Sequence, residues 1–238
     1  DPFVELVKGS LNTFLNAMTY PDKTVYPVAS CNDKDFQNLM HVYMDAVFYP
    51  NIYQHEEIFR QEGWSYHLES EDGPLTYNGV VYNEMKGAFS SADDVLERET
   101  FNTLFPDTPY GVESGGDPSC IPNLTYENFL NFHQTYYHPS NSFIYLYGNM
   151  DMEEKLEFID SHYLSAFDSL AIDSQIEDQG AFDQVHDIRK NYPVAENEGE
   201  EDNTYLSYNM VVGQAKDINL SLAFEVLDYA LLSAPGAP

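Results

Sequence analysis

The sequence contains few basic residues. Its 238 residues include 40 acidic but only 10 basic side chains, so the formal net charge is −30. A chain with so few Lys and Arg residues does not bind nucleic acid non-specifically, because that binding needs cations to neutralise phosphates, and it is repelled by anionic membranes. No apolar run approaches the roughly 20 residues of a membrane-spanning helix. We therefore expect neither nucleic acid nor a membrane as a partner.

Cysteine is also scarce. Cys31 and Cys120 are too few for a disulfide framework and lack the spacing of metal ligands, which favours a reduced, intracellular setting. The chain is nevertheless rich in core-forming residues, since hydrophobic residues make up 43% and aromatic residues 15% of it. This composition excludes disorder for most of the chain and predicts a folded protein.

Periodicity and turn residues predict a mixture of strands and helices. Residues 11–30 should form a hairpin around Pro21, Asp22 and Lys23, because β-branched and aromatic residues flank that turn. The predicted helices cover 33–48, 56–63, 80–104 with an interruption near Ser90 and Ser91, 125–137 with Thr125 as N-cap, a segment around 156–167, and 218–232. The predicted strands cover 64–68, 141–148 and 204–213. Because the elements are mixed and the first hairpin is antiparallel, we expect an α+β fold, not a doubly wound parallel sheet.

The charge composition of the chain changes at residue 168. Residues 168–202 contain 11 acidic residues and only Arg189 and Lys190 as basic ones, which is typical of an exposed connection. We therefore predict most of a first domain over 1–168, an acidic linker over 169–202, and the beginning of a second domain over 203–238. The chain starts without Met and ends in Pro and Gly, so we expect a segment of a longer protein; the alternative is a complete protein whose Met has been removed.

The histidines form no recognisable catalytic motif. Neither His-Glu-x-x-His nor the inverted His-x-x-Glu-His occurs, and each His is better explained as a structural or surface residue. Ser114, Gly115 and Gly116 form a Gly-rich stretch, but the Lys and the strand–helix context of a phosphate-binding loop are missing. This stretch is therefore predicted to be a turn.

Two carboxylates deserve comparison. Glu62 ends a predicted helix beside the only Trp, and Glu84 follows an apolar run, so we expect Glu84 to be partly buried. A buried carboxylate without a partner tends to protonate, and a metal ion is one partner that keeps it ionised. The alternative is an ordinary helix carboxylate that pairs with Lys86 or with solvent.

The segment around Glu84 resembles a known family. Residues 78–89 (Asn-Gly-Val-Val-Tyr-Asn-Glu-Met-Lys-Gly-Ala-Phe) are similar to the presequence-protease branch of the pitrilysin family, to which falcilysin and the insulin-degrading enzyme are more distant relatives. Six further blocks resemble that branch in the same order: 1–3, 15–19, 35–39, 61–64, 114–118 and 137–141. Ordered, separated blocks are far more specific than any single motif.

The resemblance implies a fold, a cofactor and site residues. The family fold is an antiparallel sheet with helices packed on one face, repeated along the chain, so residues 203–238 would begin a second copy. The resemblance implies a zinc metallopeptidase, since members of the family bind zinc through the two His of the inverted motif and a Glu further along the chain. That downstream Glu matches Glu84. An additional family acid, which would orient the metal ligands, matches Glu62. The substrate-pairing edge strand of the family matches Asn16, Ala17, Met18 and Thr19.

The sequence also departs from the family. The inverted zinc motif is absent, and so is the Arg-Tyr pair that the family supplies from its C-terminal half. We therefore expect this chain alone to bind no zinc and to be inactive, as a fragment of a zinc metalloendopeptidase that degrades short unstructured peptides, cationic ones in particular. Its partners would be peptide substrates and the remaining parts of the same polypeptide, in the cytoplasm or in an organelle such as the mitochondrial matrix. Two alternatives stay open: a non-catalytic pitrilysin-like scaffold subunit and an acidic peptide-binding module.

Overall fold

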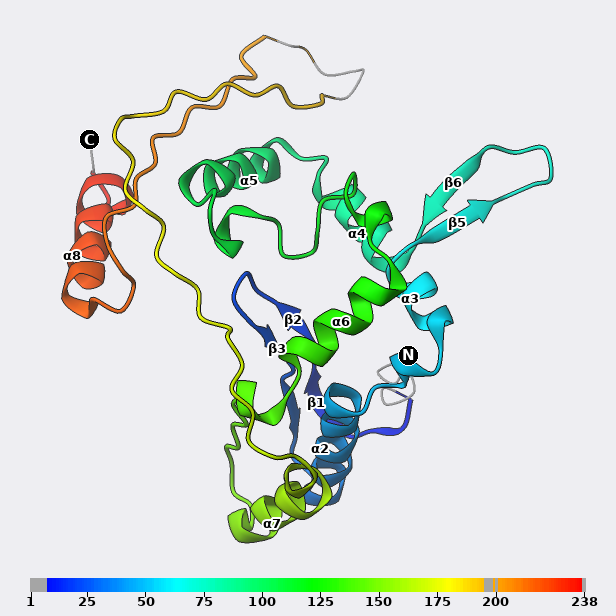
Figure 1. Cartoon of the computed structure of the whole chain (residues 1–238). Coiled ribbons are helices and arrows are strands. Elements are labelled where there is room, and N and C mark those ends of the chain that lie inside the picture. Colours follow the sequence, from blue (N-terminus) through cyan, green and yellow to red (C-terminus); the bar gives the residue numbers. More distant parts are fainter. Residues whose placement is uncertain (1–7, 195–198, 200, 237–238) are drawn as a thin grey trace. The chain divides into compact units, whose positions relative to one another are not determined.

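A computed structural model describes residues 8–194, 199 and 201–236 of the chain (Figure 1). The chain divides into two compact units, Asp1–Glu198 and Gly199–Pro238. Within the described ranges, no helix is both long enough and apolar enough to cross a bilayer.

The first unit combines short strand pairs with helices. Its strands are β1 (Asn12–Leu15), β2 (Met18–Thr19), β3 (Thr24–Val25), β4 (Val28–Ser30), β5 (Ser65–Leu68) and β6 (Leu75–Asn78). Its helices are α2 (Asp33–Phe48), α3 (Glu56–Glu62), α4 (Val80–Ala88), α5 (Ala92–Leu104), α6 (Tyr126–Tyr136) and α7 (Met152–His162). Single 3-10 turns lie at Asn51–Tyr53, Pro109–Gly111, Ile121–Asn123, Pro139–Asn141 and Leu164–Ala166. Each of these strands pairs antiparallel with its partner, which confirms the predicted α+β class.

The first four strands form one long hairpin. β1 pairs with β4 and β2 with β3, and the backbone N–H of Tyr20 closes the turn on the carbonyl of Lys23 at 2.8 Å. The carboxylate of Asp35, in the first turn of α2, accepts hydrogen bonds from the hydroxyls of Ser10 and Ser30 and from the backbone N–H of Leu11. The Ser30 bond contributes most to lowering the pKa of Asp35. One carboxylate thus joins both ends of the hairpin to the helix that follows.

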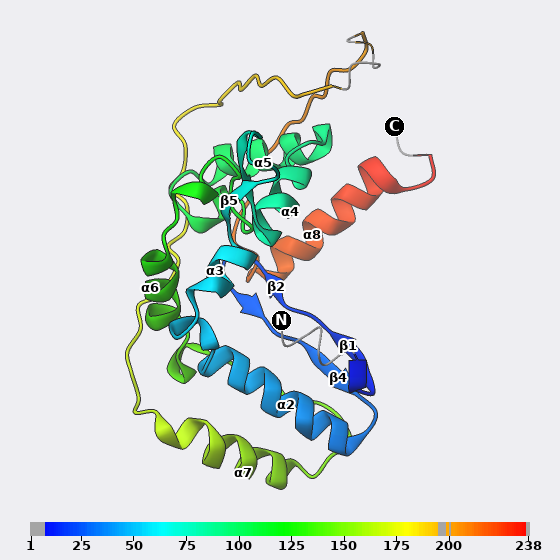
Figure 2. The same cartoon turned by 90° about the vertical axis from the view of Figure 1, so that its right-hand side faces the viewer.

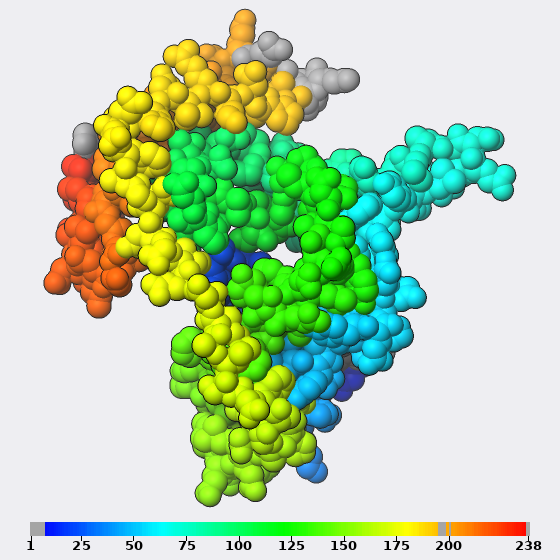
Figure 3. Space-filling view, viewed as in Figure 1, coloured from blue at the N-terminus to red at the C-terminus, as the bar shows by residue number. Residues whose placement is uncertain are grey.

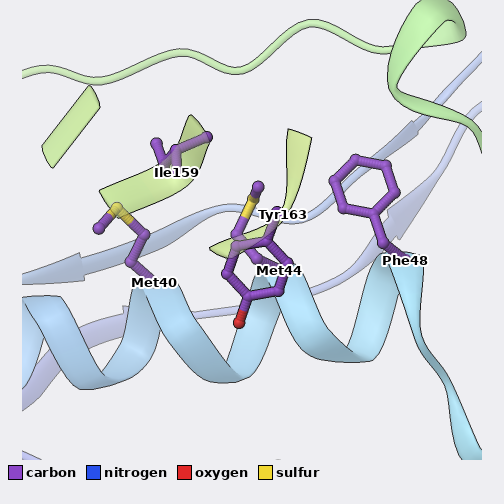
Figure 4. Close-up of a cluster of buried hydrophobic side chains, with 5 residues drawn as sticks. All are labelled: Met40, Met44, Phe48, Ile159 and Tyr163. Carbon is purple, nitrogen blue, oxygen red and sulfur yellow. The ribbon is translucent and has the colours of Figure 1, made fainter. Parts of the chain in front are cut away.

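Helix α2 supplies the main core of the first unit. Asn32 caps it by accepting a hydrogen bond from the backbone N–H of Asp35, and the helix runs beside the hairpin with α7 next to it (Figure 2). Its apolar residues recur at a spacing of four, which places them on one stripe. Figure 4 shows this stripe facing α7; the buried residues of the cluster are Met40, Met44, Phe48, Ile159 and Tyr163.

Helix α6 is fastened to the C-terminal end of α2 by polar contacts. The imidazole Nε2 of His133 lies 2.9 Å from the carbonyl oxygen of Val47, and its Nδ1 lies 2.6 Å from the hydroxyl of Tyr53. The hydroxyls of Tyr137 and Tyr26 are 2.8 Å apart, which links the end of α6 to the hairpin. These contacts explain why His133 is structural, as the absence of a catalytic motif predicted.

The break in the long helical segment is confirmed. α4 ends at Ala88 and α5 starts at Ala92, where the side chain of Ser91 accepts a hydrogen bond from the backbone N–H of Asp94. A Ser at this position competes with the helix for backbone donors and starts a new helix by capping it. The capping role of Thr125 in α6 is confirmed as well.

Two predicted strands are absent from the described structure. Strands were predicted over 141–148 and 204–213, but neither range contains a strand, and Asn141 belongs to a 3-10 turn. Both have the alternating or continuous apolar pattern of strands, but a strand exists only when a neighbour accepts and donates its backbone hydrogen bonds. Both strand predictions are wrong for the described chain, because it offers no neighbouring strand for either segment.

The second unit contains α8 (Ile218–Asp228), which continues into a π-helical turn at Tyr229–Ser233. Asp217 caps α8 by accepting from the backbone N–H of Leu220 at 3.0 Å. None of its described residues is buried, although α8 is strongly apolar.

Candidate functional site

The predicted acid Glu62 lies at the end of α3. The helix stops at Gly63, whose N–H donates to the carbonyl of Phe59 at 2.9 Å, and the next residue, Trp64, is buried. The indole N–H of Trp64 donates to the carbonyl of Leu124 at 2.9 Å. Phe59 and Trp64 form a second buried cluster with Met85 and Ile121, so the end of α3 is firmly anchored.

A projecting hairpin returns the chain to this point. β5 and β6 extend from the surface and pair over their whole length (Figure 3). After β6, Gly79 lies directly against Gly63: a Cβ atom on Gly79 would fall 2.2 Å from the carbonyl oxygen of Gly63. The N–H of Tyr82 donates to that same carbonyl at 3.3 Å. Only glycine permits this approach, and it sets the start of α4 on the end of α3.

The structure therefore brings the two predicted acids onto elements that meet. Glu62 directly precedes Gly63, and Glu84 lies on the second turn of α4, which begins beside Gly79. Glu62 is half-buried and accepts from the amide of the neighbouring Gln61 at 3.3 Å. The two acids are 22 positions apart in the sequence, and the β5–β6 hairpin returns the chain so that the ends of their helices meet.

The expected partial burial of Glu84 is wrong. Glu84 is exposed, whereas the adjacent Met85 is 7% exposed and packs into the second cluster. Successive residues of a helix point about 100° apart, so burying Met85 turns Glu84 away from the core. No described residue forms an ion pair or hydrogen bond with the Glu84 side chain, and Lys86 does not pair with it. Glu84 is thus an exposed carboxylate on α4.

The Gly-rich turn supports the same helix. A Cβ atom on Gly115 would lie 2.2 Å from the sulfur of Met85, and Gly116 has a φ of +92°, in the left-handed region that favours glycine. This stretch is a turn, as predicted, and its role is to admit the Met85 side chain. The turn therefore helps to fix the orientation of α4 and of Glu84.

The hairpin beside the two acids carries an apolar face that the sequence patterns had not singled out. Tyr66 and Tyr77 pair across the strands with ring centroids 5.5 Å apart, and both rings are exposed. Leu68 and Leu75 continue the same face. The signal was present, because apolar residues alternate on both sides of a turn containing Gly73.

The predicted substrate edge belongs to the first hairpin. The N–H of Asn16 donates to the carbonyl of Pro27 at 3.1 Å, and Met18 and Thr19 pair with β3. Ala17 lies between β1 and β2, and its N–H donates to the side chain of Asn16. Among the described strands, none pairs with the other edge of β1 and β2. An open edge of this kind can accept an extended peptide.

The residues present do not by themselves make a zinc site. Among residues 8–194, 199 and 201–236, no group of three or more His, Cys, Asp or Glu side chains is close enough to hold a metal ion. Catalytic zinc requires three protein ligands, and Glu84 would supply one. Any zinc bound through Glu84 would need its other ligands from outside the residues that the structure describes.

The chain is an α+β protein in which the helices that carry Glu62 and Glu84 meet at the Gly63–Gly79 contact, and its first hairpin has an open edge. Comparison with known proteins identifies its relatives. Residues 123–238 match the family described as the peptidase M16 inactive domain. Over all 238 residues the chain is 58% identical to Protein HypA of Clostridium perfringens. It is 44% identical over 241 aligned residues to presequence protease 1, chloroplastic/mitochondrial, of Arabidopsis thaliana, and 45% identical over 193 to the mitochondrial presequence protease of Mus musculus.

The chain belongs to the peptidase M16, or pitrilysin, family, within which it is similar to presequence proteases. The first two alignments include the whole chain, and the mouse alignment includes 79% of it. The chain spans 24%, 22% and 18% of these three relatives, so it corresponds to a quarter or less of each.

Proposed function

We propose that this chain is part of a zinc metalloendopeptidase that degrades short unstructured peptides. The observation that carries the proposal is the 44% identity to a presequence protease over the whole chain. Glu84 would be one zinc ligand, Glu62 would orient the ligands from the adjoining end of α3, and Asn16, Ala17, Met18 and Thr19 would pair with substrate. The Gly63–Gly79 contact supports the first two roles, and the open hairpin edge supports the third.

The proposal includes the domain arrangement. Residues 1–168 would belong to a first pitrilysin-like domain, 169–202 would be an acidic linker, and 203–238 would begin a second homologous domain. The zinc motif and the remaining ligands would lie elsewhere in the longer polypeptide. The compartment would be the cytoplasm in a bacterial setting or the mitochondrial matrix or another organelle, as in the names of the plant and animal relatives.

A non-catalytic role is the second proposal. It is favoured by one observation: residues 123–238 match a family described as an inactive domain. In that case the chain would be a pitrilysin-like scaffold or a peptide-binding subunit, with strand addition at the hairpin as its activity.

Substitution of the two acids in the longer polypeptide separates these proposals. Glu84→Gln should abolish peptide cleavage and reduce bound zinc, and Glu62→Gln should lower the rate about 10–100-fold, as losses of groups that orient metal ligands do. Glu97→Gln, another exposed Glu on the next helix, is the control and should retain full activity. Zinc content is measured by atomic absorption. A Glu84→Gln variant with the wild-type zinc content and the wild-type rate would refute the assignment. The 238-residue chain alone should show no chelator-sensitive cleavage.

The net charge of −30 supports a preference for cationic peptides. A negative potential raises the local concentration of cations, and salt screens it. Of two matched peptides that differ only in Lys or Glu content, the Lys-rich peptide should be cleaved more efficiently at low salt. The difference should shrink at high salt. Equal efficiencies at both salt concentrations would leave solubility as the role of the charge.

A further inference from the structure

The β5–β6 hairpin has one apolar face and one polar face. Strand pairing places Tyr66 beside Tyr77 and Leu68 beside Leu75, and the polar residues of both strands point to the opposite side. These four apolar residues, the β5–β6 face, are each between 43% and 63% exposed, so no described element covers them. Adjoining apolar side chains that are exposed to this extent mark a surface that binds another molecule.

The hairpin is also an incomplete sheet. It consists of two strands and projects from the junction of α3 and α4 (Figure 1). A two-stranded hairpin is only marginally stable in water unless a further strand or a helix packs on its apolar face. The β5–β6 face is therefore suited to a ligand that covers it.

The tyrosines of this face are held in place from below. The buried ring of Trp64 lies edge-on to Tyr66 and Tyr77, with centroids 5.5 and 5.7 Å apart, and Tyr82 lies edge-on to Tyr77 at 5.8 Å. Trp64 is itself fixed by its bond to the carbonyl of Leu124. Rings that are already ordered lose little conformational freedom when a ligand packs on them, which favours binding.

The turn that joins the two strands is acidic. Glu69, Glu71 and Asp72, which form the acidic turn, are exposed, and no described residue forms an ion pair with them. Between Arg60 and Lys86 the sequence contains no Lys or Arg, and Arg60 already forms an ion pair on α3. Charge complementarity therefore favours a ligand that carries Lys or Arg, and such side chains also bind the faces of exposed tyrosine rings.

The hairpin lies next to both acids of the proposed function. β5 begins three residues after Glu62, and β6 ends six residues before Glu84. Four strand residues span about 13 Å, and an extended peptide covers the same length with the same number of residues. A peptide that packs on the β5–β6 face can therefore continue to the junction of α3 and α4.

We propose that the β5–β6 face and the acidic turn form a docking site for peptide segments that combine apolar residues with Lys or Arg. The apolar side chains pack on the face, and the cations bind at the turn. The proposal rests on the proposed function, which makes the ligand a segment of a peptide substrate, and the site is separate from the edge of β1 and β2. A second copy of the chain is a poor occupant, because it brings an equally acidic turn.

The fluorescence of Trp64 tests the proposal in the 238-residue chain. Trp64 is the only Trp, and it lies beneath both tyrosines of the site. A short peptide in which Leu and Lys alternate should change its emission in a saturable way. Matched peptides with Glu in place of Lys, or Ser in place of Leu, should not. An unchanged emission, or an equal response to the Glu peptide, would overturn the proposal.

Substitution of the two leucines tests the apolar contact. Leu68→Ser combined with Leu75→Ser should weaken binding of the Leu-Lys peptide, measured by the anisotropy of an attached dye, by at least about 10-fold. Leu156→Ser combined with Leu170→Ser removes two similarly exposed leucines elsewhere in the first unit and should leave binding unchanged. Equal losses in the two variants would overturn the proposal.

Substitution of the turn tests the charges without altering the apolar residues, so it decides even where the serine variant disturbs the hairpin. Glu69→Gln combined with Glu71→Gln should weaken binding about 2–5-fold at low salt. Glu153→Gln combined with Glu157→Gln removes the same charge from exposed positions on α7 and is the control. Equal effects of the two variants would show attraction by the net charge alone and would overturn the site.

Two other occupants have distinct signatures. A dimer of the chain in sedimentation velocity that Leu68→Ser with Leu75→Ser dissociates would identify a second copy and overturn the proposal. A Leu-Lys peptide that binds the 238-residue chain but not the longer polypeptide would show that another segment covers the β5–β6 face, which would also overturn it.

The outcome is separable from that of the proposed function. In an active longer polypeptide, Leu68→Ser with Leu75→Ser should raise the KM for the Leu-Lys peptide and leave kcat unchanged, because the contact is the same in the ground state and the transition state. Peptide binding at the hairpin without zinc or cleavage would remove the proposed function and retain the site. An active zinc peptidase with an unchanged KM in this variant would do the reverse.

Discussion

The two units of the chain differ in what they bury. All the buried hydrophobic residues of the described chain belong to the unit Asp1–Glu198, and none is found among the described residues of Gly199–Pro238. Helix α2 carries its apolar residues on one stripe and faces α7, whereas α8 is rich in apolar residues but buries none of them among the described residues. Apolar residues form a core only when two elements present matching faces, so composition alone does not predict where a core lies.

The difference in burial also indicates how far the stability of each unit depends on further protein. A helix with so many apolar residues normally has most of its surface covered by protein. Leu222, Val226 and Leu232 of the second unit are 52%, 68% and 76% exposed. The second unit is therefore the part of the chain whose stability should depend most on further protein, and the following substitutions test that contrast in the 238-residue chain.

Truncating a leucine in each unit should give the largest contrast. Leu39, on α2, is 0% exposed, so Leu39→Ala should lower the free energy of unfolding by about 2–5 kcal/mol. Leu222→Ala on α8 should change it by less than about 0.5 kcal/mol, because little buried area is lost. Urea denaturation followed by tryptophan fluorescence and circular dichroism measures both. Similar losses for the two variants would mean that α8 is packed in the chain itself.

Adding one methyl group should give the next largest contrast. Gly79→Ala places a Cβ on the carbonyl of Gly63 and should cost about 1–3 kcal/mol as α4 shifts from α3. At Gly199 no described atom lies within 4 Å of an added Cβ, so Gly199→Ala should be nearly neutral. The midpoint of urea unfolding reports the difference, and a neutral Gly79→Ala would contradict the close junction of the two acid-bearing helices.

Removing a helix cap should separate global from local stability. Asn32→Ala, at the start of α2, should lower the global free energy of unfolding by about 1 kcal/mol. Asp217→Ala removes the equivalent bond at α8 and should reduce helical circular dichroism without moving the urea midpoint. A shifted midpoint in Asp217→Ala would show that both units unfold together.

A pH effect confined to the first unit should be the smallest. Burial lowers the pKa of His133 from its ordinary value of 6.5. The unfolded chain therefore binds this proton more readily than the folded chain, and stability should be fully present above about pH 6.5 and decrease as the pH falls toward the lowered pKa. His133→Gln should make the decrease between about pH 7 and pH 5 less steep. The second unit has no histidine, so its helicity provides the internal control. Parallel curves for wild type and variant would exclude this contribution.

Local patterns in the sequence were sufficient for the elements whose partners lie nearby in the chain. The helix over 33–48, the hairpin around Asp22 and the cap at Thr125 were all predictable, because spacing, turn residues and capping side chains act over a few residues. The α+β class followed from the same patterns. The Glu62 and Glu84 assignments came from resemblance, and they stay predictions.

Tertiary structure decided the features that depend on distant neighbours. The pattern of 141–148 predicted a strand, but strand formation needs a second backbone, and the described chain supplies none. The exposure of Glu84 was decided by Met85, which occupies the core, and the meeting of α3 with α4 was decided by the Gly63–Gly79 contact. Sequence by itself determined which segments can form helices and strands, since those preferences are local. Which of them pair, and which side chains are buried, depended on contacts between residues far apart in the chain.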